Sequence, residues 1–472
     1  MNYNRHLLIL SFFSALFITL SQSIAQEHNK KKLTLEELHI TNYPSRSELN
    51  EITLPVEKYL KVSSLNSDDI DSTFSNINDL FWLEPIAKQY KVIMVGEDHY
   101  YKYIQNLKNR ILFAVNTFDY FPYYIFEAEY SLTPYLDYYL FIKDDLEAEK
   151  YVEGIHDFIG DQSTMNLLNH IRRWNKRHPN KPIHIAFSDI EHDYRRTFSS
   201  ILKPYFSKID TSVTSWDIDR YPDLESFFPS MDSLIVTSKK QNAVGKYPFE
   251  TPEFIETVLI NLKSLFYSSS YSGMYYRQKA IVRNLTDARF LGNYLTQHKV
   301  LLHGGSNHMP THFIFPANAN FLREGCYLTH DFEPTRGKTF SITVNGGAFS
   351  LGDMKDINFL SIIRQGSGYM GLIYYLQTAY ENELISADDY YFVDEQVNDF
   401  KKLLLKEAMK FDNCPLLIDH IDWDELISAA DRHGLNKKEF QQQKSIMEKY
   451  DINIFVPKSP VMVARTRNKV NN

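Results

Sequence analysis

The sequence predicts an α/β fold with a central, largely parallel sheet flanked by helices and a helical, lid-like insertion. Four short apolar runs, at 91–95, 123–126, 183–187 and 300–302, have the length and unbroken hydrophobicity of buried strands. The segments that separate the first three runs have the length and spacing of helices. Strands that alternate with helices are typical of βαβ units, in which neighbouring strands run parallel.

The helices before and between these strands carry local signals. A short helix around 84–89 has Pro85 in its first turn, and a second helix is expected from about Tyr100 to Asn116. The second helix has apolar residues at three- and four-residue spacing, which buries one face: Ile104, Leu107, Ile111 and Ala114. Two further helices are expected from Ser131 to about Lys143 and over 163–178.

From residue 194 to residue 297 the strand signals fade and three helix-like stretches follow one another, at 223–239, 252–268 and 274–296. We expect a helical insertion between two strands, and such an insertion often forms a lid over the edge of the sheet. A strand-like segment at 339–344 is followed by Gly346-Gly347, which predicts a hairpin. The remaining tail from Asp394 is charged and helical in pattern.

The N-terminus has the pattern of a signal peptide. Arg5 precedes an apolar run over 7–20, which is shorter than the ~20 residues of a membrane-spanning helix, and small residues follow at 23–25. We therefore expect cleavage near residue 25 and export to the periplasm or the medium. The expected organisation is a signal peptide (1–25), an N-terminal arm (26–75), an α/β domain (76–350) and a mostly helical C-terminal extension packed on that domain (351–472).

Composition limits the classes of partner. The formal net charge of −8 becomes −9 without residues 1–25, because these contain one arginine and no acid. A mildly acidic protein has no general attraction for nucleic acid or anionic membrane, so we expect a small-molecule substrate and no stable membrane insertion after cleavage. The two cysteines, Cys326 and Cys414, either form one bridge or remain unpaired thiols.

Polar residues stand at or just after the end of each of the four strands: Glu97 and His99, Glu127, Asp189, and His303 with His308. Carboxyl ends of parallel strands meet at one edge of a sheet, so these side chains are expected to converge. A histidine oriented by a carboxylate can deprotonate a water that attacks an ester. Alternatively, two histidines and a glutamate can hold a divalent metal whose bound water is the nucleophile. A serine hydrolase is disfavoured, since no Gly-x-Ser-x-Gly motif is present.

The motifs at the strand ends and in the insertion follow one another in a distinctive order. An apolar strand ends in Gly-Glu, a histidine follows, and the next helix carries a basic turn at 108–110. Two strands then end in Glu127 and Asp189, the helical insertion carries Arg277 and Asn284 seven residues apart, and a histidine-rich turn closes the series. Over roughly 65–350 the chain thereby resembles the erythromycin esterase superfamily, which includes the esterases, the haem-binding ChaN-like proteins and the Tiki-type metalloproteases.

Two spacings differ from those of the esterases. One residue, Asp98, separates Glu97 from His99, whereas the esterases have two, and the shorter spacing is closer to that of the ChaN-like proteins. In the last turn the esterases have two histidines three residues apart. The sequence Gly304-Gly305-Ser306-Asn307-His308 instead resembles the Gly-x-x-His turn of the Tiki group.

The resemblance implies an exported hydrolase that acts on an ester-type bond and requires no cofactor. His99 would be the general base, held by Glu97 or Glu127, and His308 and Arg277 would face the developing negative charge. Substrate-binding or supporting roles would fall to Asp189, His303 and Asn284. The alternatives are a haem- or metal-binding ChaN-like uptake protein and a Tiki-like metal-dependent peptidase, in which His99, His308 and Glu97 or Glu127 would hold the metal. Neither the substrate nor the oligomeric state follows from the sequence.

Overall fold

The computed structural model describes residues 34–99, 101–159, 162–218, 221–268, 273–312, 323–352, 370–393, 397–460 and 462. The expected signal peptide at 1–25 and the beginning of the N-terminal arm lie outside these residues. The same holds for Tyr100, where the second helix was expected to begin.

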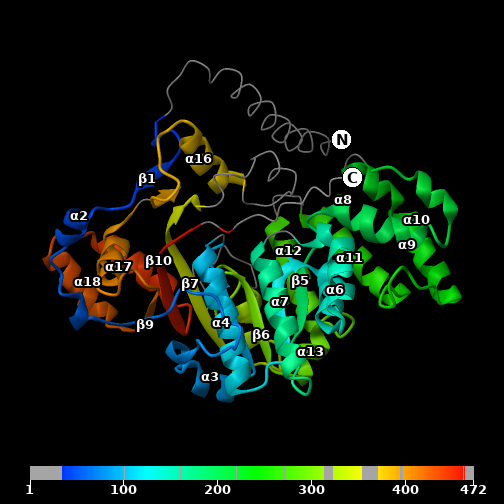
Figure 1. Ribbon diagram of the computed structural model, residues 1–472, viewed down its shortest axis with the longest axis horizontal. Helices are drawn as coiled ribbons and strands as arrows, with labels where there is room; N and C mark the ends of the chain where they lie inside the picture. Colours follow the sequence, from blue (N-terminus) through cyan, green and yellow to red (C-terminus); the bar gives the residue numbers. More distant parts are fainter. Residues whose placement is uncertain are drawn as a thin grey trace.

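The described residues form a mixed α/β fold around one ten-stranded sheet (Figure 1). The main path runs in the order β2 (Leu60–Ser64), β9 (Leu416–Ile421), β10 (Ile452–Pro460), β7 (Thr339–Ser350), β3 (Val92–Glu97), β6 (Val300–Gly305), β4 (Tyr123–Glu129) and β5 (His184–Asp189). Off this path, β1 (Ile40–Asn42) pairs with β8 (Tyr391–Val393), which also pairs with β7.

The six neighbours from β10 to β5 are parallel, and the pairs β2–β9, β9–β10, β1–β8 and β7–β8 are antiparallel. The predicted largely parallel sheet is therefore confirmed. The four predicted strands are β3, β4, β5 and β6, and they lie side by side in the order β3-β6-β4-β5. Their carboxyl ends consequently share one edge of the sheet.

Helices cover this sheet. Those of the first half are α2 (Arg46–Asn50), α3 (Leu83–Gln89), α4 (Lys102–Phe118), α5 (Thr133–Phe141), α6 (Asp145–Gly154) and α7 (Gln162–Arg177). Those of the C-terminal part are α14 (Glu324–His330), α16 (Met370–Glu381), α17 (Asp399–Met409), α18 (Trp423–Arg432) and α19 (Lys437–Met447). The expected apolar stripe of α4 is buried in the main hydrophobic core.

The insertion between β5 and β6 is mostly helical, as predicted. It comprises α8 (Tyr194–Arg196), a π-helical turn (Thr197–Leu202), α9 (Lys203–Phe206), α10 (Tyr221–Gln241), α11 (Pro252–Ser268), α12 (Gly273–Thr286) and α13 (Gly292–Gln297). In Figure 1, α9 and α10 lie out to one side, beyond the β5 edge of the sheet, whereas α12 contacts β5 itself. A lid over the carboxyl edge is not confirmed by this arrangement.

The expected hairpin at Gly346-Gly347 is wrong, because β7 continues through both glycines as one strand of twelve residues. Close packing explains why glycine occurs there. A Cβ atom at Gly346 would lie 2.0 Å from the ring of Tyr101, and one at Gly347 would lie 2.1 Å from the carbonyl oxygen of Pro457. These glycines admit neighbouring groups rather than reverse the chain.

The C-terminal part also differs from the expected pattern. It is helical in the predicted regions but adds β9 and β10 to the sheet, with β10 as the parallel neighbour of β7. Cys326 and Cys414 are both free thiols, so the single bridge considered from the sequence is not formed. Within the described ranges, the helices are too short or too polar to cross a membrane.

Candidate functional site

The site is built at the shared carboxyl edge of β3, β6, β4 and β5. Glu97 is the last residue of β3, and Asp189 is the last residue of β5. His303 lies inside β6, opposite Val95 of β3 on one side and Phe126 of β4 on the other. Sequence positions more than 200 residues apart are thus brought together by strand register alone.

Glu97, His99, Lys108 and His303 form the first group of charges, which we call the Glu97 cluster. The Glu97 side chain is 4% exposed, and its Oε2 lies 2.6 Å from the Lys108 ammonium. Its Oε1 lies 3.1 Å from Nε2 of His303 and 3.2 Å from Nδ1 of His99. A buried carboxylate is tolerated only when it is paired in this way.

The charges of this cluster fix its protonation. Burial alone would raise the pKa of Glu97, but Lys108 and His303 hold it well below its usual value. Burial and the neighbouring Lys108 ammonium lower the pKa of His303 to about 4. Nε2 of His303 lies 2.7 Å from Lys108 Nζ and 3.1 Å from Oε1 of Glu97, so it faces both a donor and an acceptor, whereas its Nδ1 has no hydrogen-bond partner among the described residues. With a pKa of about 4, His303 is neutral at pH 7.

His99 is the exposed member of the Glu97 cluster, with 48% of its side chain accessible. Burial would lower the pKa of this imidazole, but the hydrogen bond to Glu97 and the charge of that carboxylate outweigh it and raise the pKa above 6.5. Since Glu97 is ionised, Nδ1–H of neutral His99 donates to it, and the lone pair then resides on Nε2.

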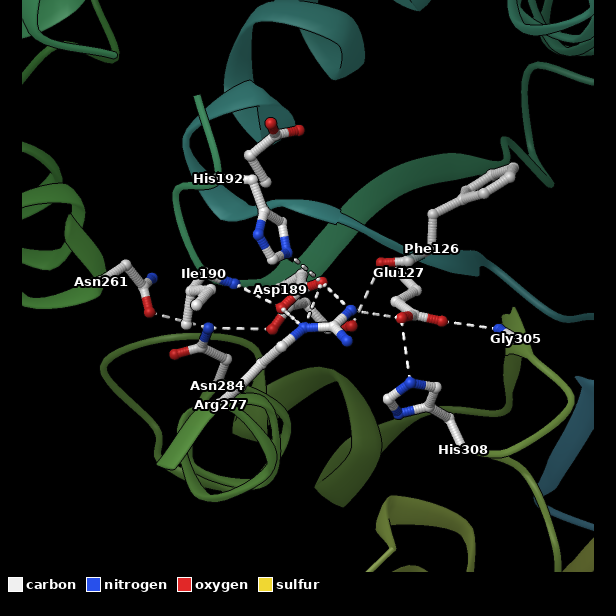
Figure 2. Close-up of polar contacts among 12 residues, drawn as sticks. Phe126, Glu127, Asp189, Ile190, His192, Asn261, Arg277, Asn284, Gly305 and His308 are labelled. Carbon is white, nitrogen blue, oxygen red and sulfur yellow. Dashed lines mark hydrogen bonds and ion pairs between the residues drawn. The ribbon is translucent and has the colours of Figure 1, made fainter. Parts of the chain in front are cut away.

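Glu127, Asp189, Arg277, His308 and Glu324 form the second group, the Glu127 cluster, most of which Figure 2 shows. Arg277 from α12 binds Asp189 with Nε at 3.1 Å from Oδ1 and Nη2 at 2.6 Å from Oδ2. The same Nη2 lies 2.5 Å from Oε1 of Glu127. Burial would raise the pKa of Asp189, but His192 and Arg277 lower it below its usual range. Asp189 is therefore ionised, and one guanidinium binds both carboxylates.

His308 lies between two carboxylates. Its Nε2 is 3.1 Å from Oε1 of Glu127, and its Nδ1 is 2.9 Å from Oε1 of Glu324. Burial would lower the pKa of this imidazole, but Glu324 and Glu127 together raise it to about 9. At neutral pH His308 is an imidazolium that donates from both ring nitrogens.

Gly304 and Gly305, the last two residues of β6, lie where the two clusters meet. The Gly305 N–H donates to Oε2 of Glu127 at 2.6 Å. A Cβ atom at Gly305 would lie 3.0 Å from Nε2 of His99, and one at Gly304 would lie 2.8 Å from Oε2 of Glu127. His99 and Glu127 therefore flank the same stretch of backbone, and a side chain larger than hydrogen at position 304 or 305 would crowd them.

The remaining sequence-predicted residue, Asn284, is fully buried behind the site. Its amide nitrogen donates to the carbonyl oxygen of Ser188 and to the side chain of Asn261, both at 2.9 Å. These bonds fasten α12 to β5 and to α11, and so help to position Arg277, which lies about two turns earlier on α12. Among the described residues, Asn284 bonds to Ser188, Asn261 and Arg283 rather than to the charged side chains of the two clusters, so it supports the site from behind.

Sequence reasoning passed over three contacts of the site. Lys108 sits four residues after Ile104 on the apolar face of α4, and a charged residue in such a stripe signals a buried ion pair. His192 lies three residues after the end of β5, in a polar segment, and its Nε2 is 2.8 Å from Oδ2 of Asp189. The sequence does not mark Glu324 as a site residue, because it does not follow an apolar strand as the other site residues do.

The ion pairs of the two clusters occupy the groups that would bind a metal in the metal-dependent alternative. In the described part of the chain, no group of three or more His, Cys, Asp or Glu side chains is arranged to hold a metal ion. The Lys108 ammonium lies between Glu97 and His303, and the Arg277 guanidinium lies against Glu127. Both nitrogens of His308 contact carboxylates. The donor set proposed from the sequence therefore does not fit a divalent metal in this arrangement.

Comparisons with known proteins place the fold. No protein-family model and no curated protein matches the chain. A Bacillus cereus protein of known structure has a TM-score of 0.51 and 13% identity, over 90% of this chain and 100% of that chain. A protein described as a succinoglycan biosynthesis protein gives the same TM-score and identity over 89% of this chain and 100% of that chain.

A mutant of the erythromycin esterase EreC in its open conformation is a weaker match. Its TM-score is 0.44 at 10% identity, over 83% of this chain and 97% of that chain. The two matches with a TM-score of 0.51 indicate a shared fold, which does not by itself define an activity.

Proposed function

We propose that this chain is a hydrolase that cleaves an ester-type bond with a water molecule activated by His99. One observation carries the proposal: an exposed imidazole has one ring nitrogen 3.2 Å from a buried, ionised glutamate. That contact orients the ring, selects the tautomer with a basic Nε2 and stabilises the imidazolium formed in the reaction. The motif order that resembles the erythromycin esterase superfamily supports the same assignment.

In the proposed reaction, Nε2 of His99 takes a proton from water while the water oxygen attacks the acyl carbon. The carbon–oxygen bond to the leaving group then breaks, and the proton on His99 passes to the departing alkoxide. The products are an acid and an alcohol, and His99 returns to its neutral state. Glu97 stays ionised throughout, since Lys108 compensates its charge.

The Glu127 cluster supplies positive charge for the oxygen that becomes negative during the attack. His308 is a fixed imidazolium and Arg277 a fixed guanidinium, and neither has to be protonated when the reaction occurs. Both groups are hydrogen-bonded to Glu127, so the negative oxygen would share their donors with that carboxylate. Asp189 holds the guanidinium in place, and Asn284 holds the helix that carries it.

We further propose that the substrate is a small molecule and that the protein acts after export, on the basis of its acidic charge and N-terminal pattern. The ChaN-like and Tiki-like alternatives need a haem or metal ligand set, and no contact among the described residues favours one. The insertion from 194 to 297 is proposed to shape substrate access, because it provides Arg277 to the site.

The test uses the purified protein and a panel of aryl, alkyl and cyclic esters. Removing the base in His99→Ala should lower kcat by a factor of ~100 or more. His420→Ala is the matched control, since His420 is an exposed histidine on β9, and its rate should equal that of the wild type. Addition of a chelator should change nothing. Equal hydrolysis by the wild type and by His99→Ala would refute the proposal, as would activity that a chelator abolishes and a divalent ion restores.

A further inference from the structure

Glu324 lies outside the motifs discussed above, yet it is one of the most buried charged side chains of the molecule. Its side chain is 1% exposed, and it is the first residue of α14. Its Oε1 lies 2.9 Å and its Oε2 lies 3.2 Å from Nδ1 of His308, so both oxygens face one imidazole nitrogen. Its Oε2 also accepts a hydrogen bond from the amide of Gln278 on α12.

The arrangement around His308 determines where its protons are. Nε2 faces a carboxylate oxygen of Glu127 at 3.1 Å, and Nδ1 faces Glu324. A neutral imidazole has a single N–H, and an ionised carboxylate only accepts, so a neutral ring would direct a lone pair at one of the two carboxylates. Both contacts are satisfied when the ring carries a proton on each nitrogen.

Gln278 connects this contact to the rest of the Glu127 cluster. It follows Arg277 directly on α12, so one helix provides the guanidinium that binds Glu127 and the amide that binds Glu324. The position of His308 is therefore defined from β4 through Glu127 and from α14 and α12 through Glu324. Glu324 is the charged group bound to Nδ1 of His308, and Glu127 and Arg277 are the other charges that act on the ring.

We propose that Glu324 is a positioning residue that fixes the orientation of His308 and keeps it doubly protonated. In the proposed hydrolysis this makes His308 a permanent hydrogen-bond donor toward negative charge and prevents it from competing with His99 as a base. The role in catalysis rests on the proposed function, whereas the effect on the His308 ring does not.

The direct test is NMR spectroscopy of the full-length protein labelled with ¹⁵N at histidine. The His308 ring is assigned from the signal that is lost in His308→Gln. In the wild type at pH 7.5 both ring nitrogens should have imidazolium shifts. Glu324→Gln has nearly the same shape without the charge, and it should lower the titration midpoint of His308 by one unit or more. Glu333→Gln removes an exposed charge nearby in sequence and should leave the midpoint unchanged.

Hydrolysis gives the second readout. With an ester that the wild type cleaves, Glu324→Gln should lower kcat about tenfold or more with little change in KM, because a charge that acts in the transition state is lost. Glu324→Asp should recover part of the rate. A purely structural role would instead lower thermal stability without moving the His308 midpoint.

The outcomes are distinguishable. An unchanged His308 midpoint in a folded Glu324→Gln protein would overturn the positioning role, whatever the rates are. A lowered midpoint in a protein that hydrolyses no ester would support the control of His308 by Glu324 and count against the proposed function alone. If Glu324→Gln fails to fold, Glu324→Asp, which keeps the charge but shortens its reach to Nδ1 of His308, gives the same NMR comparison. There the His308 midpoint should also fall, and a constant value would contradict the account.

Discussion

The Glu97 cluster and the Glu127 cluster are built from the same residue types, yet they prepare their histidines for different tasks. In the Glu97 cluster the carboxylate is compensated by Lys108 and hydrogen-bonded to the exposed His99, whose pKa the charge of Glu127 also raises. In the Glu127 cluster His308 is buried between two carboxylates and is cationic. Burial between two carboxylates thus makes His308 a charged donor, whereas the more exposed His99 can serve as a base.

His303 extends the comparison to a third state. It is buried like His308 but adjoins an ammonium, and its pKa falls to about 4. One edge of the sheet therefore holds a neutral histidine, a permanently charged histidine and one that titrates above 6.5. The charged partners of the three rings therefore account for their different protonation states.

The largest expected effect is on the stability of the Glu97 cluster. Lys108→Met leaves a buried carboxylate without its ammonium and should lower the free energy of unfolding by about 3–5 kcal/mol, measured by urea denaturation. The matched control is Lys88→Met, because the exposed Lys88 binds the exposed Glu84 one helical turn away at 2.6 Å. Its loss should cost about 0–1 kcal/mol, as for other surface pairs. Equal losses of unfolding free energy in the two variants would show that Lys108 stabilises the buried Glu97 no more than a surface lysine stabilises its partner.

A smaller effect should appear in the pH dependence of stability. The pKa of His308 is raised in the folded protein to about 9, against 6.5 as its usual value. Its contribution is therefore fully present below about pH 6.5 and is lost as the pH rises through about 9. The free energy of unfolding should decrease over this interval by an amount on the order of 1–3 kcal/mol.

The variant His308→Gln isolates that contribution. It should be less stable than the wild type at pH 6.5, and the difference between the two proteins should shrink toward pH 9. Urea denaturation at several pH values gives the comparison. A constant difference across the interval would mean that His308 is not charged in the folded protein.

The smallest effect concerns the support of the Glu127 cluster. Asn284→Ala removes hydrogen bonds to Ser188 and Asn261 and should cost about 1–3 kcal/mol of folding free energy. Hydrolysis should weaken less than in His99→Ala, since Arg277 retains its own bonds to Asp189. A rate loss as large as that of His99→Ala, in a folded protein, would assign Asn284 a direct role that its contacts do not indicate.

Much of the fold was predictable because buried parallel strands and amphipathic helices have strong periodic signals. The strands β3, β4, β5 and β6 were located, as was the helical nature of the insertion. β10 was missed because Pro457 and Pro460 weaken its strand pattern. Pro457 is accommodated because β9 pairs only with residues 453–455, so at Pro457 that side of β10 needs no N–H.

The site was predictable to the extent that it lies at strand ends. Glu97, Glu127 and Asp189 are last or near-last residues of strands, and register brings them together. The difference between His99 and His308 was not predictable, because it depends on Lys108 and Glu324, whose proximity arises from the packing of α4 and α14. The sequence motifs identify the histidines and carboxylates of the site, but they do not indicate which charged groups lie beside each histidine ring.

The pH dependence of ester hydrolysis tests the central claim most directly, because His99 and His308 are assigned opposite protonation states in it. The rate at saturating substrate should rise with pH through the pKa of His99, which lies above 6.5, and should fall as His308 loses its proton near 9. In His308→Gln the residual activity should keep the rising limb and lose the falling one. A wild-type rate that is highest below pH 6, or an unchanged falling limb in His308→Gln, would contradict the assignment of His99 as the base and His308 as the fixed cation.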